Sequence, residues 1–212
     1  MRAAVLAGIS LFLLVGCTGS PAENVAAPPV HTAPVLAPGK PGEPAATLKP
    51  SEYPTAVPSE KVNAADVQYV ENMILHHRQA LDMSDLAPTR AANQQVKAIA
   101  SRIKDSQEPE IKAMAAWLTN QDLQVPEHHS GTHPNMPGMA TPDQLTALRA
   151  ATGPAFDKAY LELMIVHHQG AVTMAEQLLL NGSHVMVEEM AKDVVSVQTG
   201  EINRLRAIQA RL

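Results

Sequence analysis

Two short segments of the chain place methionine and histidine at the same spacing. Residues 73–83 read MILHHRQALDM and residues 164–174 read MIVHHQGAVTM. Imidazole nitrogen and thioether sulfur together favour copper, whereas zinc more often recruits cysteine or carboxylate beside histidine. Both segments are therefore candidate metal sites, and the candidate ligands are Met73, His76, His77 and Met83 in the first and Met164, His167, His168 and Met174 in the second.

These segments belong to a longer internal repeat. When the sequence is shifted by 91 residues without gaps, identical residues coincide at many positions, among them Asp66 with Asp157, Tyr69 with Tyr160, Glu71 with Glu162, Ala80 with Ala171, Val96 with Val187, Gln107 with Gln198, Glu110 with Glu201 and Ile111 with Ile202. Self-similarity at one fixed offset is typical of a duplicated supersecondary unit. The sequence predicts a domain made of two copies of one helical hairpin.

Apolar residues in both copies recur at the three- and four-residue spacing of an amphipathic helix. We expect helices over residues 60–87 and 90–120 in repeat one, and over 155–180 and 184–211 in repeat two. The stretch Thr141-Pro142-Asp143-Gln144 has the features of a helix start, which predicts a short connector helix up to about residue 151. Four long amphipathic helices in two hairpins predict an all-α, up-down four-helix bundle.

The helical periodicity places both histidine pairs at the centre of the apolar stripe, the face that a bundle buries. On the partner helix of repeat one, Gln107, Glu110 and Met114 share the apolar face, and repeat two has Gln198 and Glu201 at the matching positions. A buried carboxylate needs a hydrogen-bonding partner or a metal. These five residues therefore join the candidate metal ligands.

A structural interpretation of the same pattern stays open. A layer of histidine with glutamine and glutamate can serve core specificity through hydrogen bonds alone. Methionine at helical spacing is also a common way to fill a core. The duplication of the whole pattern, with histidine and flanking methionine in both copies, favours the metal interpretation.

A third group of candidate ligands lies between the repeats. It comprises His128, His129, His133, Met136 and Met139. The alternative is an ordinary polar loop, or a histidine tract that binds zinc or nickel. With nine histidines, ten methionines and a single cysteine, the chain is typical of a soft-ligand protein from an oxidising compartment, for which copper is the expected metal.

The N-terminus has the features of an export signal. Residues 1–2 form a positive start, and the apolar stretch 3–15 is too short for a stable membrane span. Residues 14–17 read LVGC, which resembles the lipobox of bacterial lipoproteins and implies cleavage after residue 16 and a diacylglycerol on Cys17. The alternative is an ordinary signal peptide with an incidental cysteine. The lipobox predicts a protein anchored to the cell membrane by lipid, facing the periplasm or the extracellular side.

The proline distribution divides the rest of the chain. Ten of the 17 prolines lie in residues 18–58, a composition that cannot bury enough apolar surface to fold. After a signal peptide over 1–16, we therefore expect a Pro/Ala-rich disordered tether over 17–58 and a folded domain over 59–212. Within that domain the expected parts are repeat one at 59–120, the connector at 121–154 and repeat two at 155–212.

Charge and motif content exclude other functional classes. The chain has 16 lysines and arginines against 21 aspartates and glutamates, with no basic patch of the kind that binds nucleic acid. No Ser-His-Asp or Cys-His arrangement for nucleophilic catalysis is visible, so no catalytic residue is expected. The expected partners are a copper ion and the membrane that holds the lipid anchor.

The motifs together resemble the domain of unknown function 305 family. They are the segments at 73–83 and 164–174, Gln107-x-x-Glu110-Ile111-x-x-Met114-x-x-Trp117-Leu118, and Met136-Pro137-Gly138-Met139 before Thr141-Pro142. The resemblance covers about residues 62–211 and implies a ferritin-like four-helix bundle from an exported bacterial protein. Some members bind copper and are linked to copper tolerance, which implies metal contacts at the histidines and methionines of both segments. Leu205 departs from the pattern, because repeat one has Met114 at that position, and the second site is poorer if that methionine is a ligand.

Three hypotheses follow for the function. The leading one is an extracytoplasmic copper-binding lipoprotein that sequesters copper or passes it on without turnover. The second is a ferritin-like di-metal oxidase, although such sites use a Glu-x-x-His motif that this sequence lacks. The third is a structural or interaction bundle in which the histidines serve only the core.

Overall fold

The computed structural model describes residues 35–37, 45–49, 61–127 and 136–212, which fall into two compact units, Met1–Val57 and Pro58–Leu212. In the first unit, strand β1 (Val35–Ala37) pairs antiparallel with β2 (Ala46–Leu48). The sequence analysis expected no regular structure there. Valine, leucine and threonine favour short strands, although two strands alone are marginally stable. The signal segment and Cys17 lie outside the described residues.

The second unit is helical, as predicted. Its elements are α1 (Ala64–Ser84), α2 (Ala87–Arg90), α3 (Gln94–Asn120), α4 (Pro142–Ala150), α5 (Pro154–Asn181) and α6 (Val185–Gln209). The first predicted helix is divided, because α1 ends at Ser84 and Pro88 lies in the first turn of the separate α2. Proline has no backbone N–H to continue the hydrogen bonding of the preceding helix. None of the helices in the described ranges is long and apolar enough to cross a membrane.

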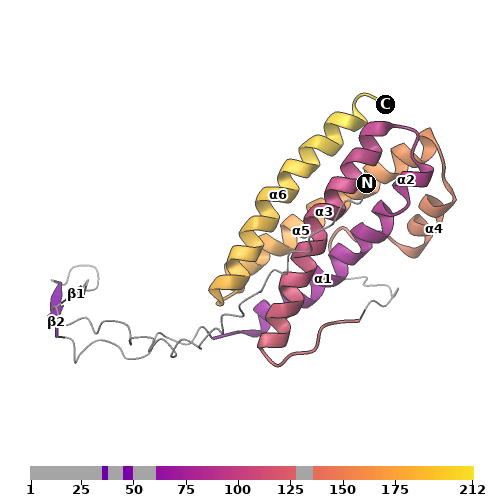
Figure 1. Cartoon of the computed structure of the whole chain (residues 1–212). Coiled ribbons are helices and arrows are strands. Elements are labelled where there is room, and N and C mark those ends of the chain that lie inside the picture. The colour runs from indigo at the N-terminus through magenta and orange to yellow at the C-terminus, as the bar shows by residue number, and fades with distance from the viewer. Residues whose placement is uncertain (1–34, 38–44, 50–60, 128–135) are drawn as a thin grey trace, which may run out of the picture. The chain divides into compact units, whose positions relative to one another are not determined.

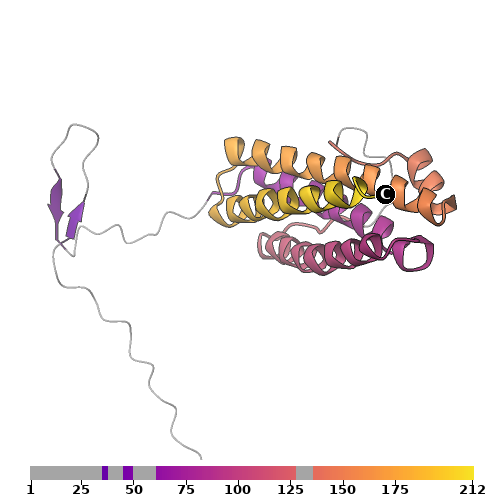
Figure 2. The same ribbon diagram turned by 90° about the horizontal axis from the view of Figure 1, so that it is seen from above.

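The four long helices form a bundle of two hairpins (Figure 1). Helix α1 packs on α3 and α5 packs on α6, and the hairpins meet through α1 against α5 and α3 against α6. Each hairpin runs up and down as expected. Helix α5 begins beside the start of α3, where Asp157 contacts Ala92 and Asn93 (Figure 2). The repeats are therefore related by an approximate two-fold axis perpendicular to the helices.

Two apolar clusters fill the bundle, one at each end. The Phe156 cluster joins the ends of α1 and α6 to the starts of α3 and α5, and includes Met83, Val96, Ile103, Leu148, Phe156, Met164 and Leu205. The Trp117 cluster joins the opposite ends of the same helices, and includes Tyr69, Met73, Met114, Trp117, Met174, Ala175, Leu178 and Val194. The histidine pairs of α1 and α5 lie between the clusters along both helices.

Two equivalent aspartates fix the hairpins to each other. Asp157 of α5 accepts backbone hydrogen bonds from Ala92 and Asn93 in the other hairpin, at 3.2 and 2.8 Å. Asp66 of α1 does the same for Ser183 at 3.1 Å. Both carboxylates lie at the N-terminus of the opposite hairpin's second long helix, where the backbone N–H groups lack partners within the helix. These reciprocal caps set how the two histidine-bearing helices align.

Candidate metal centre

The four histidines of the two segments meet in one layer at the middle of the bundle. All four rings are fully buried. The ring centroids of His76 and His167 are 3.7 Å apart, and those of His167 and His168 are 6.3 Å apart. His76 and His167 occupy equivalent positions in the repeats, so the approximate two-fold axis passes between them. The two segments, which the sequence presents as two candidate sites, thus bring their imidazoles into a single group.

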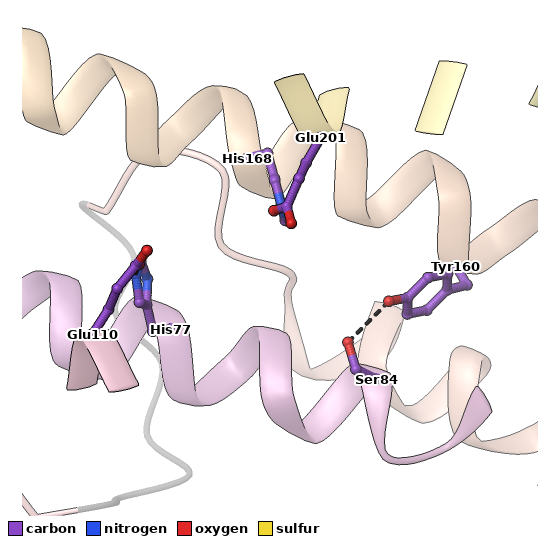
Figure 3. A network of polar contacts seen from close by, with 6 residues as sticks. All are labelled: His77, Ser84, Glu110, Tyr160, His168 and Glu201. Atoms are coloured by element: carbon purple, nitrogen blue, oxygen red, sulfur yellow. Dashed lines mark hydrogen bonds and ion pairs between the residues drawn. The ribbon is translucent and has the colours of Figure 1, made fainter. Parts of the chain in front are cut away.

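Each outer histidine is held by a glutamate from the neighbouring helix of its own hairpin. His77 Nε2 lies 2.6 Å from Glu110 Oε2, and His168 Nε2 lies 2.9 Å from Glu201 Oε2. Figure 3 shows the two pairs, one on each hairpin. An ionised carboxylate can only accept, so Nε2 of each ring donates the hydrogen bond, and a neutral ring in this orientation has its lone pair on Nδ1.

A third histidine is oriented by the connector. Nε2 of His76 donates to the backbone carbonyl of Pro137 at 3.0 Å, which again leaves Nδ1 as the acceptor nitrogen. Nδ1 of all three held rings, and both nitrogens of His167, are buried without a hydrogen-bond partner within the described residues. Histidines that bind metal characteristically donate the other ring N–H to a carboxylate or a carbonyl. The hydrogen bonding of these rings fits metal ligation through Nδ1.

Burial keeps the central rings neutral. It is the main cause that lowers the pKa of His76 from 6.5 to about 3, with His77 and His168 adding to the effect and the bond to Pro137 opposing it. Burial also lowers the pKa of His167 well below its usual value, reinforced by the three other histidines, while the backbone of His76 opposes the shift less strongly. Only a neutral imidazole can ligate a metal, so these rings are ready to bind at neutral pH.

Two glutamines complete the layer. Gln107 and Gln198 are each 1% exposed, and their amide atoms have no hydrogen-bond partner in the described part of the chain. Oε1 of Glu201 is also buried without a partner there. We call the following set the polar layer: His76, His77, His167, His168, Gln107, Glu110, Gln198 and Glu201. Buried polar atoms left without partners are costly, so this layer is built to take up something polar.

The two glutamates differ in exposure, which the sequence analysis did not expect. The side chain of Glu201 is 1% exposed and that of Glu110 is 26% exposed. Both were expected in the core stripe because they occupy equivalent positions. The repeat-one carboxylate thus keeps contact with solvent, while its counterpart is sealed in.

The methionines lie on both sides of the polar layer rather than in one set per hairpin. Met73 shares the Trp117 cluster with Met174 of the other repeat, and Met83 shares the Phe156 cluster with Met164. The antiparallel crossing of α1 and α5 causes this exchange of partners. Each side of the layer therefore has thioethers from both repeats, and Met114 adds one only on the Trp117 side, since Leu205 replaces it on the other.

Histidine and carboxylate alone do not make a metal site here. Among the residues that the structure describes, no three side chains of the His, Cys, Asp or Glu types are grouped so as to hold a metal ion. Both carboxylates of the polar layer already accept from imidazoles.

The structure describes two of the five candidate ligands in the connector. Met136 and Met139 are partly buried and lie on either side of Pro137-Gly138, which crosses α5 at Gly170. A Cβ at Gly170 would lie 2.0 Å from the carbonyl oxygen of Pro137, so only glycine admits this crossing. His128, His129 and His133 lie outside the described residues.

Sequence reasoning missed the side chains that position the layer. Gln79 exchanges two hydrogen bonds with the backbone of Ala140, at 3.0 and 2.7 Å, and so fixes the connector over His76. Ser84 bonds the hydroxyl of Tyr160 at 2.9 Å. The repeated aspartates at 66 and 157 were visible as part of the duplication, but their reciprocal capping needs the arrangement of the hairpins.

Comparison with known proteins places this architecture in a family. The crystal structure of a DUF305 fragment from Deinococcus radiodurans is 32% identical, with a TM-score of 0.66, and the match covers 71% of this chain and 99% of that one. A putative secreted DUF305 protein from Streptomyces coelicolor is 28% identical, with a TM-score of 0.63, and the match covers 69% and 93%.

A copper-bound protein is also similar. CopM in its Cu(II)-bound form is 31% identical, with a TM-score of 0.60, and the match covers 69% of this chain and 96% of that one. No match was found among curated proteins. The family model described as "Domain of unknown function (DUF305)" matches residues 66–209, and the chain belongs to this family.

Proposed function

We propose that this protein is an extracytoplasmic copper-binding lipoprotein, which sequesters copper or passes it on without turnover. The chain would be anchored through a lipid on Cys17, and the bundle would bind copper at the polar layer and its flanking methionines. The similarity to CopM, solved in Cu(II)-bound and Cu(I)-bound forms, supports copper as the cargo. The similarity to a secreted DUF305 protein supports a location outside the cytoplasm.

The observation that carries the proposal is the state of the imidazole nitrogens. Three buried rings are oriented by Nε2–H bonds to Glu110, Glu201 and the Pro137 carbonyl, and their Nδ1 atoms have no partner within the described residues. A purely structural histidine layer would use both nitrogens of a buried ring. Thioethers on either side supply ligands suited to the cuprous ion, while imidazole suits both oxidation states.

Copper titration of the purified protein tests the proposal. Replacing Met73, Met83, Met164 and Met174 by leucine conserves volume and fold, because leucine and methionine interchange with little cost in cores. We expect this variant to lose cuprous affinity by about tenfold or more, which is about 1.4 kcal/mol of binding free energy. Met186→Leu is the matched control, since Met186 is 54% exposed at the start of α6.

Histidine variants complete the test. Replacing His76, His77, His167 and His168 by alanine is expected to abolish high-affinity copper binding, with folding verified by circular dichroism. Unchanged stoichiometry and affinity in both the histidine and the methionine variants would remove the polar layer from the site. Labelling with a radioactive fatty acid, lost in Cys17→Ala, tests the anchor.

The second candidate is a ferritin-like di-metal oxidase, favoured by the two buried His–Glu pairs. In each pair the glutamate and the histidine come from different helices, so neither pair forms the Glu-x-x-His arrangement on one helix that such sites use. Oxygen consumption on addition of ferrous iron, lost in Glu201→Gln, would establish this activity. We expect no consumption above the buffer rate.

A further inference from the structure

We propose that copper reaches and leaves the polar layer from one end of the bundle only, through a cavity between α1 and α5 lined by amide and thioether side chains. This inference rests on the proposed function, and it adds a route and a direction to it. The two halves of the bundle are built from the same repeat, so each difference between them can be compared position by position.

The cavity lies between the start of α1, the end of α5 and the connector. It has a volume of about 490 Å³. Its rim includes the amides of Gln68, Asn72, Gln177 and Asn181, and its other lining side chains include Met136 and Met174. We call it the amide cavity. Amide oxygens can accept hydrogen bonds from the water shell of an arriving ion, and the thioethers offer the first soft ligands.

The amide cavity borders the polar layer at three points. Pro137 lines the cavity, and its carbonyl accepts the Nε2–H of His76. Met174 lines it and is 7% exposed. Tyr69 also lines it, and burial, followed by the charge of Glu110, raises the pKa of this phenol.

Three of the four equivalent positions in the other half are apolar, and the fourth, the counterpart of Asn181, is Arg90. Shifted by 91 residues, Gln68 becomes Ala159, Asn72 becomes Leu163 and Gln177 becomes Leu86. All three replacements pack against the Phe156 cluster, and Leu148 of α4 is buried in that cluster. A second cavity of about 700 Å³ lies there under α4, but its lining includes neither Tyr160 nor Met83, the counterparts of Tyr69 and Met174. Ala159 and Leu163 line this second cavity in place of Gln68 and Asn72, so the two cavities differ in the side chains that face them.

The two equivalent tyrosines, Tyr69 and Tyr160, also differ in their hydrogen bonding. Tyr160 is tied to Ser84 by a 2.9 Å hydrogen bond (Figure 3). The hydroxyl of Tyr69 has no hydrogen-bond partner among the described residues, and Ala175 stands where the other repeat has Ser84. Among the described residues, the tyrosine next to the amide cavity thus lacks the hydrogen bond that holds its counterpart. This agrees with the partial exposure of Glu110 on the same half.

The test places the apolar residues of one half of the bundle at the equivalent positions of the other half. The sealed variant combines Asn72→Leu with Gln177→Leu. The first substitution introduces the residue found at position 163 of repeat two, and the second introduces the residue found at position 86 of repeat one. The rate at which bound Cu⁺ passes to a coloured cuprous chelator is measured by stopped flow, and Ag⁺ uptake is measured separately. We expect both rates to fall by about tenfold or more, which corresponds to about 1.4 kcal/mol of added barrier, while stoichiometry stays unchanged. Ala147→Leu, which fills the second cavity instead, is the matched control.

A gentler variant and a copper-independent measurement support the same test. Ala175→Ser supplies Tyr69 with the hydroxyl that Ser84 supplies to Tyr160, and it is expected to slow Cu⁺ release. In the metal-free protein, hydrogen peroxide is expected to oxidise Met174 faster than Met83, as read by peptide mass spectrometry, and the sealed variant is expected to remove the difference.

Each outcome is decisive. If the parent protein binds copper but the sealed variant transfers it at the parental rate, or Ala147→Leu slows transfer equally, the route is wrong while copper binding stands. Equal oxidation of Met174 and Met83 in the parent overturns the difference in access without reference to copper. A parent protein that binds no copper overturns the proposed function and this route with it.

Discussion

The four histidines of the polar layer have the same side chain, but their hydrogen-bond partners in the fold differ. His77 and His168 are held by carboxylates, His76 is held by a backbone carbonyl, and His167 is held by no hydrogen bond from the described residues. A carboxylate partner makes an imidazole a stronger ligand, because it stabilises the positive charge that ligation places on the ring. The outer rings are therefore the stronger ligands, and His167 is fully buried with its ring centroid 3.7 Å from that of His76.

The burial of the central rings predicts a pH-dependent stability for the metal-free protein. The folded-state pKa of His76 is about 3, below the 6.5 of an unfolded chain, and that of His167 is also well below it. The unfolded chain therefore takes up protons first as the pH falls. Stability is complete above pH 6.5 and declines below it toward pH 3, by about 1.4 kcal/mol per pH unit for each ring.

Urea denaturation between pH 4 and 7.5, without metal, measures this dependence. A variant with His76→Gln and His167→Gln removes the two titrating groups and is expected to flatten the decline between pH 6.5 and 4.5. A parent protein whose urea midpoint is constant over that interval would show that the rings are not held neutral in the fold.

The carboxylates that hold the outer rings predict a second effect. Glu201→Gln removes the negative acceptor from His168, and Glu110→Gln does the same for His77. Loss of such a partner typically weakens metal affinity by about tenfold to a hundredfold. We expect the larger loss for Glu201, because its side chain is 1% exposed and water cannot replace it.

Equilibrium competition with a cuprous chelator gives the affinities. Glu162→Gln, at an exposed position on α5, controls for the change in net charge. If Glu201→Gln binds copper as tightly as Glu162→Gln does, the His168–Glu201 bond has no part in ligation.

At the scale of elements, the helices could be predicted and their mutual placement could not. Helical periodicity identified the four long helices and showed that the histidines face the core, because a bundle buries the apolar stripe. The single shared layer depends on how α1 crosses α5, which the caps at Asp66 and Asp157 and the glycine at 170 determine. These are contacts between distant segments, and no local pattern encodes them.

The same limit explains the unexpected glutamate. Glu110 and Glu201 have equivalent positions in the repeat, and a local pattern assigns them equal burial. Their exposure differs because the surroundings of the two halves differ in ways that lie on other elements, such as the amide residues of α1 and the cover provided by α4.

The crossing of the connector over α5 predicts opposite effects for two glycines. In Gly170→Ala the new Cβ would lie 2.0 Å from the Pro137 carbonyl oxygen and 2.7 Å from Gly138 Cα, both backbone atoms that cannot move aside cheaply. We expect a loss of about 1–3 kcal/mol, typical of overpacking. In Gly200→Ala the nearest atom is the flexible Arg204 Nη1 at 3.4 Å, so α6 gains about 0.5–1 kcal/mol.

Urea midpoints of the two variants, at equal m-values, check this prediction. The Gly170 variant is also expected to free His76 from Pro137, which would appear as a change in its imidazole resonances. Equal stability of the two variants would mean that the connector does not pass over Gly170 in solution.

At the scale of the whole molecule, the polar layer is nearly symmetric, but the two ends of the bundle around it differ. The duplication supplies paired imidazoles, carboxylates and amides about one axis. The two ends then differ, since apolar side chains and the second cavity lie under α4 at one end and the amide cavity lies at the other. A single binding centre with one accessible end suits a carrier that receives and delivers its ion at the same face.

This arrangement predicts a thermal signature that is specific for the metal. A ligand that binds only the native state stabilises it by about 2.7 kcal/mol when present at a hundred times its dissociation constant. For a domain of this size each kcal/mol raises Tm by about 2–4 °C, so copper should raise Tm by about 5–10 °C. Zinc and ferrous iron should shift it less, because thioether sulfur suits a soft ion better than it suits these ions. A chelator should reverse the shift, and the methionine-to-leucine variant should reduce the cuprous shift more than the cupric one. A Tm indifferent to copper, or raised equally by zinc, would leave the histidines with a structural role only.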